Sequence, residues 1–372
     1  ARHQTAIPMA FRLQEIYMAL STLLLSTLDH HKVAQIAEWV ALAHTIVAAQ
    51  PVPVGDPLYH STQFYLMSID AINIQAVTQP MPPPAPWPAI EFASATGQAM
   101  DSAAVRAYVA ARQPQLIFYS AADPVYVTRH ARRYVSTLLQ RCDVPFLVIV
   151  QVIGGMGRLP EMAHTIGIDD PHLILAADDF QPDTIRAITW KINEPTPIRT
   201  PLVYYQSARF LWLGYLLEQF NTPVIVADID QLLQRGLRDL LEGFAQCDVV
   251  FHERPHGVKI ADRLIANLLL VYPTATGRLF TQFFRYYLGW ALQNAEHRGA
   301  YAYFLDQCAL LMARHHLLWM GQPRLDRFAK LDINTGMYGA YEENPFRFFS
   351  FYSGFDMASL PEAPRGERPN DP

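Results

Sequence analysis

The chain has 372 residues, of which 51% are hydrophobic and 17% are charged, against about 25% charged residues in a typical soluble domain. This length predicts two or three structural units, and the apolar composition excludes disorder over most of the chain. The formal net charge of -5 provides no general basic field, so we expect no nucleic-acid partner.

The cysteines and the longest early apolar run bear on the compartment. Cys142, Cys247 and Cys308 lie far apart in the sequence and form neither a disulfide framework nor a zinc-ligand pattern, which favours a reducing, cytoplasmic compartment. The apolar run 16–28 is too short to span a bilayer and lacks a small-residue cleavage site. We therefore expect no integral membrane segment and no signal peptide.

Residues 1–79 predict an α-helical N-terminal domain. Apolar residues recur at three- and four-residue spacing over 9–28 and 33–47, and a third helix is expected at about 58–76. Such a module serves either as a cap or dimerisation element or as the remnant of a helical repeat array, and the oligomeric state stays open. Residues 80–92 open with a run of prolines that cannot continue a helix, so they predict a linker.

Residues 93–360 predict an α/β domain, and the proline-rich, polar residues 361–372 predict a disordered tail. Short apolar runs bounded by polar residues indicate buried parallel strands, and helical segments separate them. This alternation predicts an open twisted sheet with helices on both faces. The strands are expected at 116–120, 144–153, 172–176 and 222–230, and the helices at 103–112, 125–141 and 205–220.

Asp228 and Asp230 follow the apolar strand residues 224–227. In an open α/β sheet, ligands gather at the carboxyl ends of the strands. Two carboxylates one residue apart can present hard oxygens to one Mg²⁺ or Mn²⁺, which in turn can hold a diphosphate. The same two acids can instead begin the turn before the next helix, where aspartates cap well.

The order of the motifs around this pair resembles the centre of the GT-A type of nucleotide-diphospho-sugar glycosyltransferase. The arginine-containing helix YQSARF at 205–210 precedes the strand TPVIVADID at 222–230, which is similar to the Asp-x-Asp strand of that family. Three further segments are similar to that fold: a first nucleotide-binding strand with its loop at 117–126, the segment 265–277, and an Asp-Gln-x-x-Leu helix at 304–310. The resemblance implies a GT-A fold, a Rossmann-like open sheet, behind a small all-α domain.

The same resemblance implies the ligands and the roles of particular residues. The donor would be a nucleotide sugar, with UDP-sugars favoured, the cofactor Mn²⁺ or Mg²⁺, and the acceptor an unknown protein, glycan or lipid-linked molecule. Asp230 would ligate the metal, and Asp228 would contact the metal or the ribose. Arg209 would either contact the nucleotide or fix the strand ends by an ion pair. The other implied residues are Ser120, Ala121 and Tyr126 around the base, Asn267 at the donor, and Asp306 and Gln307 as catalytic residues, with Asp306 either a general base or a helix-capping acid.

Departures from the family pattern keep other functions open. Asn267 is followed by two leucines in place of a glycine that permits close backbone approach, and no histidine follows His316 to serve as a third metal ligand. A non-catalytic nucleotide-sugar-binding or scaffold protein is therefore an alternative. The sequence Asp-Ile-Asp at 228–230 is also similar to the first motif of haloacid-dehalogenase-type phosphatases, in which Asp228 would be the nucleophile. Gln231 stands where that motif has a glycine.

Three other clusters invite a function. The histidines of 251–256 are expected in a polar loop or at a metal site, and His315 and His316 at a turn or a helix end. The aromatic run 346–355 either stacks on an acceptor sugar or packs in the core.

Overall fold

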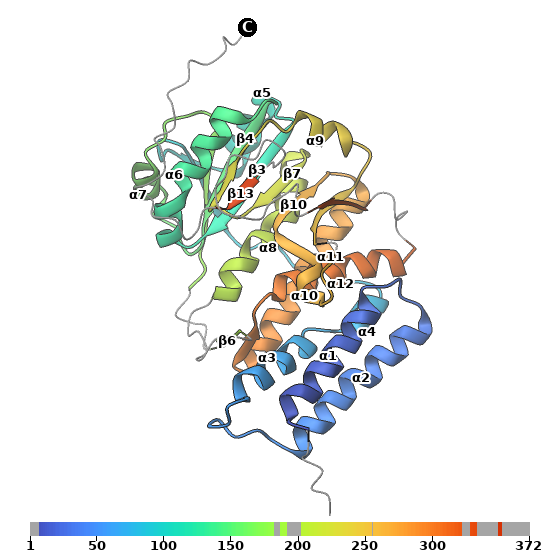
Figure 1. Ribbon diagram of the computed structural model, residues 1–372. Helices are drawn as coiled ribbons and strands as arrows, with labels where there is room; N and C mark the ends of the chain where they lie inside the picture. The colour runs from blue at the N-terminus through green and yellow to red at the C-terminus, as the bar shows by residue number, and fades with distance from the viewer. Residues whose placement is uncertain are drawn as a thin grey trace, which may run out of the picture.

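The computed structural model describes residues 7–181, 187–191, 202–254, 256–321, 328–332 and 349–351. A sheet region and a helical N-terminal region lie at opposite ends of the molecule, with α11 (Ala275–His297) and α12 (Leu305–Trp319) between them (Figure 1). The predicted α/β class, with a helical region in front, is confirmed. Within the described ranges, no helix is both long enough and apolar enough to cross a bilayer.

The N-terminal region is a group of helices, two of which have side-chain caps. Asp29 caps α2 by accepting a hydrogen bond from the Lys32 amide at 2.8 Å, and Asn73 caps α4 by accepting one from the Ala76 amide at 3.0 Å. The apolar face of α1 packs against α2 and α3, as the three- and four-residue spacing of its apolar residues requires. The helices are α1 (Met9–Leu24), α2 (His30–Ala49), α3 (Tyr59–Asp70) and α4 (Ile74–Thr78).

One hydrophobic core runs from these helices into the sheet region. Tyr287 of α11 lies at this junction and is fully buried. Its hydroxyl donates to the carbonyl of Ala71 at 2.7 Å and accepts from the amide of Asn73 at 2.6 Å, both in the turn between α3 and α4. The helical region therefore contacts the rest of the chain through packed side chains as well as through the covalent connection.

Two histidines of α12 make the second contact between the regions. The Nε2 atom of His315 lies 2.5 Å from the carbonyl of Leu24, and the Nδ1 atom of His316 lies 2.9 Å from the carbonyl of Val77. Burial lowers the pKa of both imidazoles, that of His315 to about 4, so both are neutral at pH 7. The two residues lie at the end of α12, as expected, with His316 in its last turn, and both side chains are buried.

The proline-rich segment 80–89 runs without regular structure along α8 (Leu202–Phe220) and α11. The indole nitrogen of Trp87 donates to a carboxylate oxygen of Glu218 at 2.9 Å, and the ring stacks on α8 aromatics. The guanidinium of Arg285 lies 3.7 Å from the Trp87 ring centroid and donates to two backbone carbonyls of the segment. The segment is thus held on two helices.

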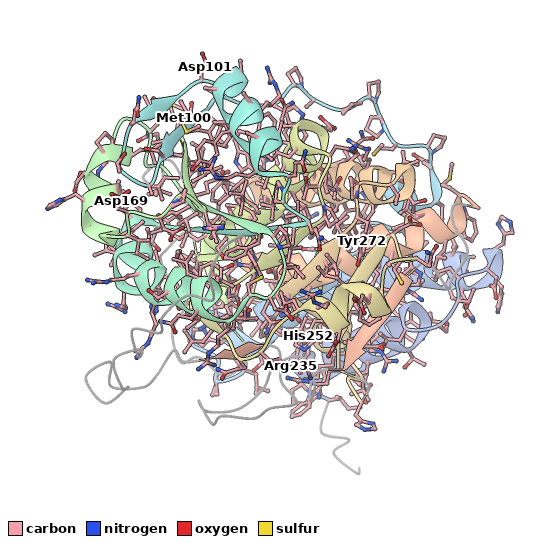
Figure 2. The ribbon with its side chains drawn as sticks, turned by 90° about the horizontal axis from the view of Figure 1, so that it is seen from above. Met100, Asp101, Asp169, Arg235, His252 and Tyr272 are labelled. Atoms are coloured by element: carbon pink, nitrogen blue, oxygen red, sulfur yellow. The ribbon has the colours of Figure 1, made fainter. Side chains whose placement is uncertain are left out.

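The sheet has nine strands in the described residues, in the order β12-β9-β10-β7-β3-β4-β5-β1-β2. Four neighbours, β7, β3, β4 and β5, are parallel, whereas β10 is antiparallel to both β7 and β9. In the view from above, Met100 of β2 lies at the upper left and His252 of β9 lies below the centre of the molecule (Figure 2). The strands are β1 (Ile90–Ser94), β2 (Ala99–Met100), β3 (Leu116–Ala122), β4 (Phe146–Val152), β5 (Leu173–Asp178), β7 (Val224–Ala227), β9 (Val249–Glu253), β10 (Leu264–Val271) and β12 (Phe328–Asp332).

Helices cover both faces of this sheet, as the uninterrupted apolar strands require. Along β3, Ile117 and Tyr119 belong to the core shared with α8, α11 and α12, and Leu116 and Phe118 belong to the core under α6, α7 and α9. The remaining elements are α5 (Ser102–Arg112), α6 (Pro124–Arg141), α7 (Leu159–Ile166), α9 (Arg238–Gly243), α10 (Ile260–Arg263), and the paired short strands β6 (Ile188–Trp190) with β11 (Ala300–Ala302) and β8 (Gln231–Leu233) with β13 (Phe349–Phe351).

Removing the hydroxyl of Tyr287 tests its contribution to the contact between the two regions. We expect Tyr287→Phe to lower the free energy of unfolding by about 1–3 kcal/mol, because the change leaves a buried carbonyl and a backbone amide without their shared partner. Urea denaturation followed by far-ultraviolet circular dichroism measures this. The matched control is Tyr286→Phe, at the half-buried neighbouring position on α11, and an equal loss in both variants would contradict the assignment.

Candidate functional site

The connections of the parallel strands create one topological switch point. The chain steps from β3 to β4 to β5 in one direction and then returns through α8 to place β7 on the other side of β3. The loops after β3 and β7 therefore leave in opposite directions, and in open α/β sheets ligands bind in the crevice that this opens. Ser120, near the end of β3, is buried and donates from Oγ to the carbonyl of Ala227 at 2.6 Å, which ties the two strand ends together.

Asp228 and Asp230 lie at this switch point, in the turn directly after β7. The turn is held by β10, because the carbonyl of Asn267 accepts from the amide of Asp228 at 3.2 Å and from the side-chain amide of Gln231 at 2.8 Å. The side chain of Asn267 faces His252, whose Nδ1 atom lies 2.7 Å from Oδ1 of Asn267. Asn267 thus positions the acidic turn through its backbone.

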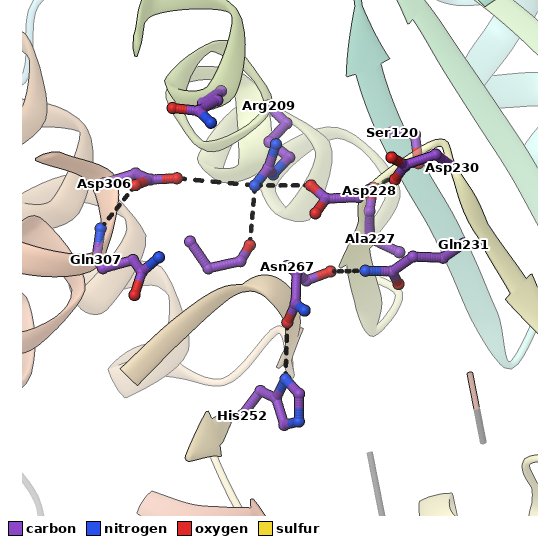
Figure 3. Close-up of polar contacts among 12 residues, drawn as sticks. Ser120, Arg209, Ala227, Asp228, Asp230, Gln231, His252, Asn267, Asp306 and Gln307 are labelled. Atoms are coloured by element: carbon purple, nitrogen blue, oxygen red, sulfur yellow. Dashed lines mark hydrogen bonds and ion pairs between the residues drawn. The ribbon is translucent and has the colours of Figure 1, made fainter. Parts of the chain in front are cut away.

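Arg209 of α8 lies between two of the acidic residues (Figure 3). Its Nη2 atom is 2.9 Å from Oδ1 of Asp228 and 3.7 Å from Oδ2 of Asp306, and it donates to the carbonyl of Ala266 at 3.0 Å. Arg209 and Asp306 are buried, whereas the side chain of Asp228 is 22% exposed. The ion pair expected as one of the two roles of Arg209 is therefore present, and its contact with a nucleotide stays a prediction.

Burial raises the pKa of both carboxyl groups beside Arg209. For Asp228, burial and the neighbouring charges of Asp230 and Asp306 outweigh the attraction of Arg209, and the pKa rises to about 7. The 22% exposure of this side chain moderates the effect of burial. The pKa of Asp306 also rises because of burial, opposed by Arg209 and by hydrogen bonds from the backbone. Perturbed carboxyl groups at a strand-end crevice are typical of functional sites.

Asp230 is buried and turned toward α6. The hydroxyl of Tyr126 donates to Oδ2 of Asp230 at 2.5 Å, and the Tyr126 ring packs against His130, with centroids 4.1 Å apart. Asp123 places Tyr126 there by capping α6, since its carboxylate accepts from the Tyr126 amide at 3.0 Å. Tyr126 therefore reaches the metal-binding candidate; its expected contact with a nucleotide base stays a prediction.

The other expected site residues lie at the same edge of the sheet. Ala121 is buried at the end of β3. Gln307 follows Asp306 in the first turn of α12, and its backbone amide donates to Oδ1 of Asp306 at 2.9 Å. With its nitrogen turned toward α10 and β10, the Gln307 side chain donates to the carbonyls of Ala261 and Leu264, the latter at 3.0 Å. Gln307 thus contacts the backbone that supports Asp306, and its catalytic role stays a prediction.

A buried polar chain beside the crevice was missed by the sequence analysis. Tyr119 donates to Gln151 at 2.5 Å, Gln151 donates to Asp178 at 2.8 Å, and Asp178 accepts from the amide of Gly154 at 2.6 Å. These side chains link the ends of β3, β4 and β5. Gln151, a polar residue inside an apolar strand run, was the signal that could have revealed this chain, because buried polar groups need partners.

The donor atoms of the acidic turn fit a hard divalent cation. Asp228 and Asp230 supply carboxylate oxygens, the ligands that Mg²⁺ and Mn²⁺ prefer, and a cation would offset the burial and the neighbouring negative charges that together raise the pKa of Asp228. In the part of the chain that the structure describes, no three histidine, cysteine, aspartate or glutamate residues form a complete cluster for a metal. Most of the aromatic run 346–355 lies outside the described residues.

Comparison with known proteins gives only solved structures, since no family model and no curated protein matches the chain. The bifunctional glycosyltransferase WbbM, in its apo structure, is 10% identical over 65% of this chain and 46% of its own, with a TM-score of 0.40. Mouse xyloside xylosyltransferase 1, in its apo form, is 11% identical over 65% of this chain and 98% of its own, with a TM-score of 0.37. The galactosyltransferase LgtC, in complex with donor and acceptor sugar analogues, is 13% identical over 64% of this chain and 87% of its own, with a TM-score of 0.39.

All three of these structures are glycosyltransferases, and this chain spans less than half of WbbM. Because these structures are at most 13% identical to this chain, its activity has to be inferred from its own residues.

The raised pKa of Asp228 predicts a pH-dependent metal affinity. Because a metal ligand must be a deprotonated carboxylate, protons compete with Mn²⁺ below the pKa of about 7. We expect the Mn²⁺ affinity to be constant above about pH 8 and to fall by up to about tenfold per pH unit below 7. Electron paramagnetic resonance of free Mn²⁺ between pH 5.5 and 8.5 measures this. Asp228→Asn should bind more weakly and lose the slope, and a flat profile for the unaltered chain would contradict the assignment.

Proposed function

We propose that this chain is a metal-dependent glycosyltransferase of the GT-A type, which moves a sugar from a nucleotide-diphospho-sugar to an acceptor. The observation that carries this proposal is the pair of ion pairs that Arg209 forms with Asp228 and Asp306 at the topological switch point. These contacts bring a candidate metal ligand, a cation and a second acidic group together. Glycosyl transfer from a diphosphate needs groups of these kinds, because charge develops on the leaving diphosphate and the acceptor hydroxyl loses a proton.

The donor would be held at the acidic turn. Asp228 and Asp230 would hold a divalent cation, which supplies Lewis-acid neutralisation of the leaving diphosphate. Tyr126 orients Asp230 through the hydrogen bond at 2.5 Å, and Arg209 orients Asp228 at 2.9 Å. These contacts fix both carboxylates before any ligand arrives, and such preorganisation is a main source of electrostatic stabilisation in enzymes.

Asp306 is the group we assign to accept the proton of the acceptor hydroxyl. It begins α12, so the partial positive charge of the helix N-terminus and Arg209 both favour its ionised form, whereas burial favours the neutral form. Burial prevails, so the pKa of this carboxyl group is higher than that of an ordinary aspartate. A raised pKa suits a general base. Gln307 would support this residue through its bonds to α10 and β10.

Donor binding tests the proposed site. We expect UDP-sugars to bind this chain in isothermal titration calorimetry only when Mn²⁺ is present, and Asp230→Asn to weaken binding at least about 30-fold, because the variant lacks a charged metal oxygen. The matched control is Asp239→Asn, an acid whose side chain is 75% exposed on α9 and which should leave binding unchanged. GDP-sugars are titrated in parallel, and the nucleotide sugar that binds more tightly identifies the nucleotide base of the donor.

Different results would favour the alternatives. Failure of every nucleotide sugar to bind would overturn the donor site, and hydrolysis of p-nitrophenyl phosphate that disappears in Asp228→Asn would favour a phosphatase. Metal-dependent binding without turnover of the donor, either by transfer or by hydrolysis, would favour a non-catalytic nucleotide-sugar-binding protein.

The assignment of Asp306 predicts a split between binding and turnover. We expect Asp306→Asn to reduce donor turnover by about 10²-fold or more, the usual contribution of a general base, while the donor dissociation constant changes less than about threefold. Coupled detection of the released nucleoside diphosphate measures turnover, and calorimetry measures binding. A variant that keeps full turnover, or one that loses donor binding in proportion, would contradict this role.

A further inference from the structure

A half-buried pair of aromatic rings lies directly before Asp306. Tyr303 and Phe304 occupy the connection from β11 to α12, and their ring centroids are 4.1 Å apart with the planes at 69°. Two polar groups border the pair: the ammonium of Lys191 lies 4.6 Å from the Tyr303 centroid, and the side-chain amide of Gln206 donates to the Tyr303 hydroxyl at 3.0 Å. We call these four residues, Lys191, Gln206, Tyr303 and Phe304, the aromatic shelf.

The residues of the shelf and the catalytic candidates have the same spacing along the chain. Gln206 and Arg209 are three residues apart on α8, and the residues they contact, Tyr303 and Asp306, are also three apart. Three residues of an α-helix rise about 4.5 Å. The Gln206–Tyr303 contact and the Arg209–Asp306 ion pair are therefore made by residues about one helical turn apart along α8.

The backbone at the shelf has a conformation that few side chains tolerate. Phe304 precedes α12 with φ of +69°, in the left-handed region, and it offers no side-chain hydrogen bond to the helix as a cap. A bulky aromatic residue in this region is strained, and such strain is retained mainly at functional positions. Phe304 is also close to Asp306 in the chain, two residues before it.

We propose that the aromatic shelf binds a pyranose ring of the acceptor, stacked on Phe304, with an acceptor hydroxyl reaching Asp306. This inference depends on the proposed glycosyl transfer and adds the class of acceptor. A pyranose presents a face of C–H bonds to the negative face of an aromatic ring and a rim of hydroxyls to polar groups. The shelf supplies both, since the amide of Gln206 and the ammonium of Lys191 adjoin the rings.

Saturation-transfer difference NMR tests the shelf without a known acceptor. The probes are methyl β-D-galactopyranoside and methyl β-D-glucopyranoside, with sorbitol as a polyol that has no ring face, each added without donor. We expect saturation at the ring C–H protons of at least one pyranoside, and none for sorbitol. Phe304→Leu should reduce this signal about fivefold, whereas Phe304→Tyr, which keeps the aromatic face, should retain it.

Donor calorimetry with Mn²⁺ on the same variants separates the two proposals. We expect Phe304→Leu to bind the donor within twofold of the unaltered chain. Equal pyranoside signals in the unaltered chain and Phe304→Leu, saturation of sorbitol, or no pyranoside signal would each overturn the acceptor shelf. Loss of donor binding in Phe304→Leu would also overturn it, by making the shelf part of the donor site. A Phe304-dependent pyranoside signal in a chain that binds no donor would refute the donor site and, with it, the acceptor role of the shelf, and would leave only a pyranose-binding site.

Discussion

The site depends on one buried cation. Arg209 contacts Asp228, Asp306 and the carbonyl of Ala266, so a single guanidinium connects α8 with the end of β7, with β10 and with the start of α12. A buried charge is tolerated only when it is compensated, and removing one partner of such a group leaves the others unpaired at a cost of several kcal/mol. The positions of the two acids are therefore set jointly, since neither can move without weakening the contacts of Arg209.

The rest of the fold holds these elements in place. The switch in strand order opens the crevice, and the hydrogen bond from Ser120 to Ala227 keeps the two central strand ends together. β10 enters antiparallel beside β7, which brings the Asn267 carbonyl to the acidic turn. Behind α12, the helical region is packed into the same core through Tyr287 and the buried histidines. The N-terminal helices thus support the site although they contribute none of its assigned groups.

The sequence was sufficient for the class of fold and for the acidic pair, because both leave local signals. Apolar runs of strand length marked β3, β4, β5 and β7, and Asp228 and Asp230 stood at the end of one of them. The contact of Tyr126 with Asp230 and the pairing of His252 with Asn267 join residues 104 and 15 positions apart, and no local pattern encodes such pairs. The burial of His315 and His316 was missed for the same reason, since their partners lie more than 200 residues earlier in the chain.

The placement of α12 has a mechanical consequence. Its first turn carries Asp306, and its last turns are held by the carbonyls of Leu24 and Val77 through His315 and His316. A helix of 15 residues is a stiff rod about 22 Å long. A displacement of the N-terminal helices would therefore be transmitted along this rod to the carboxylate of Asp306 at its other end.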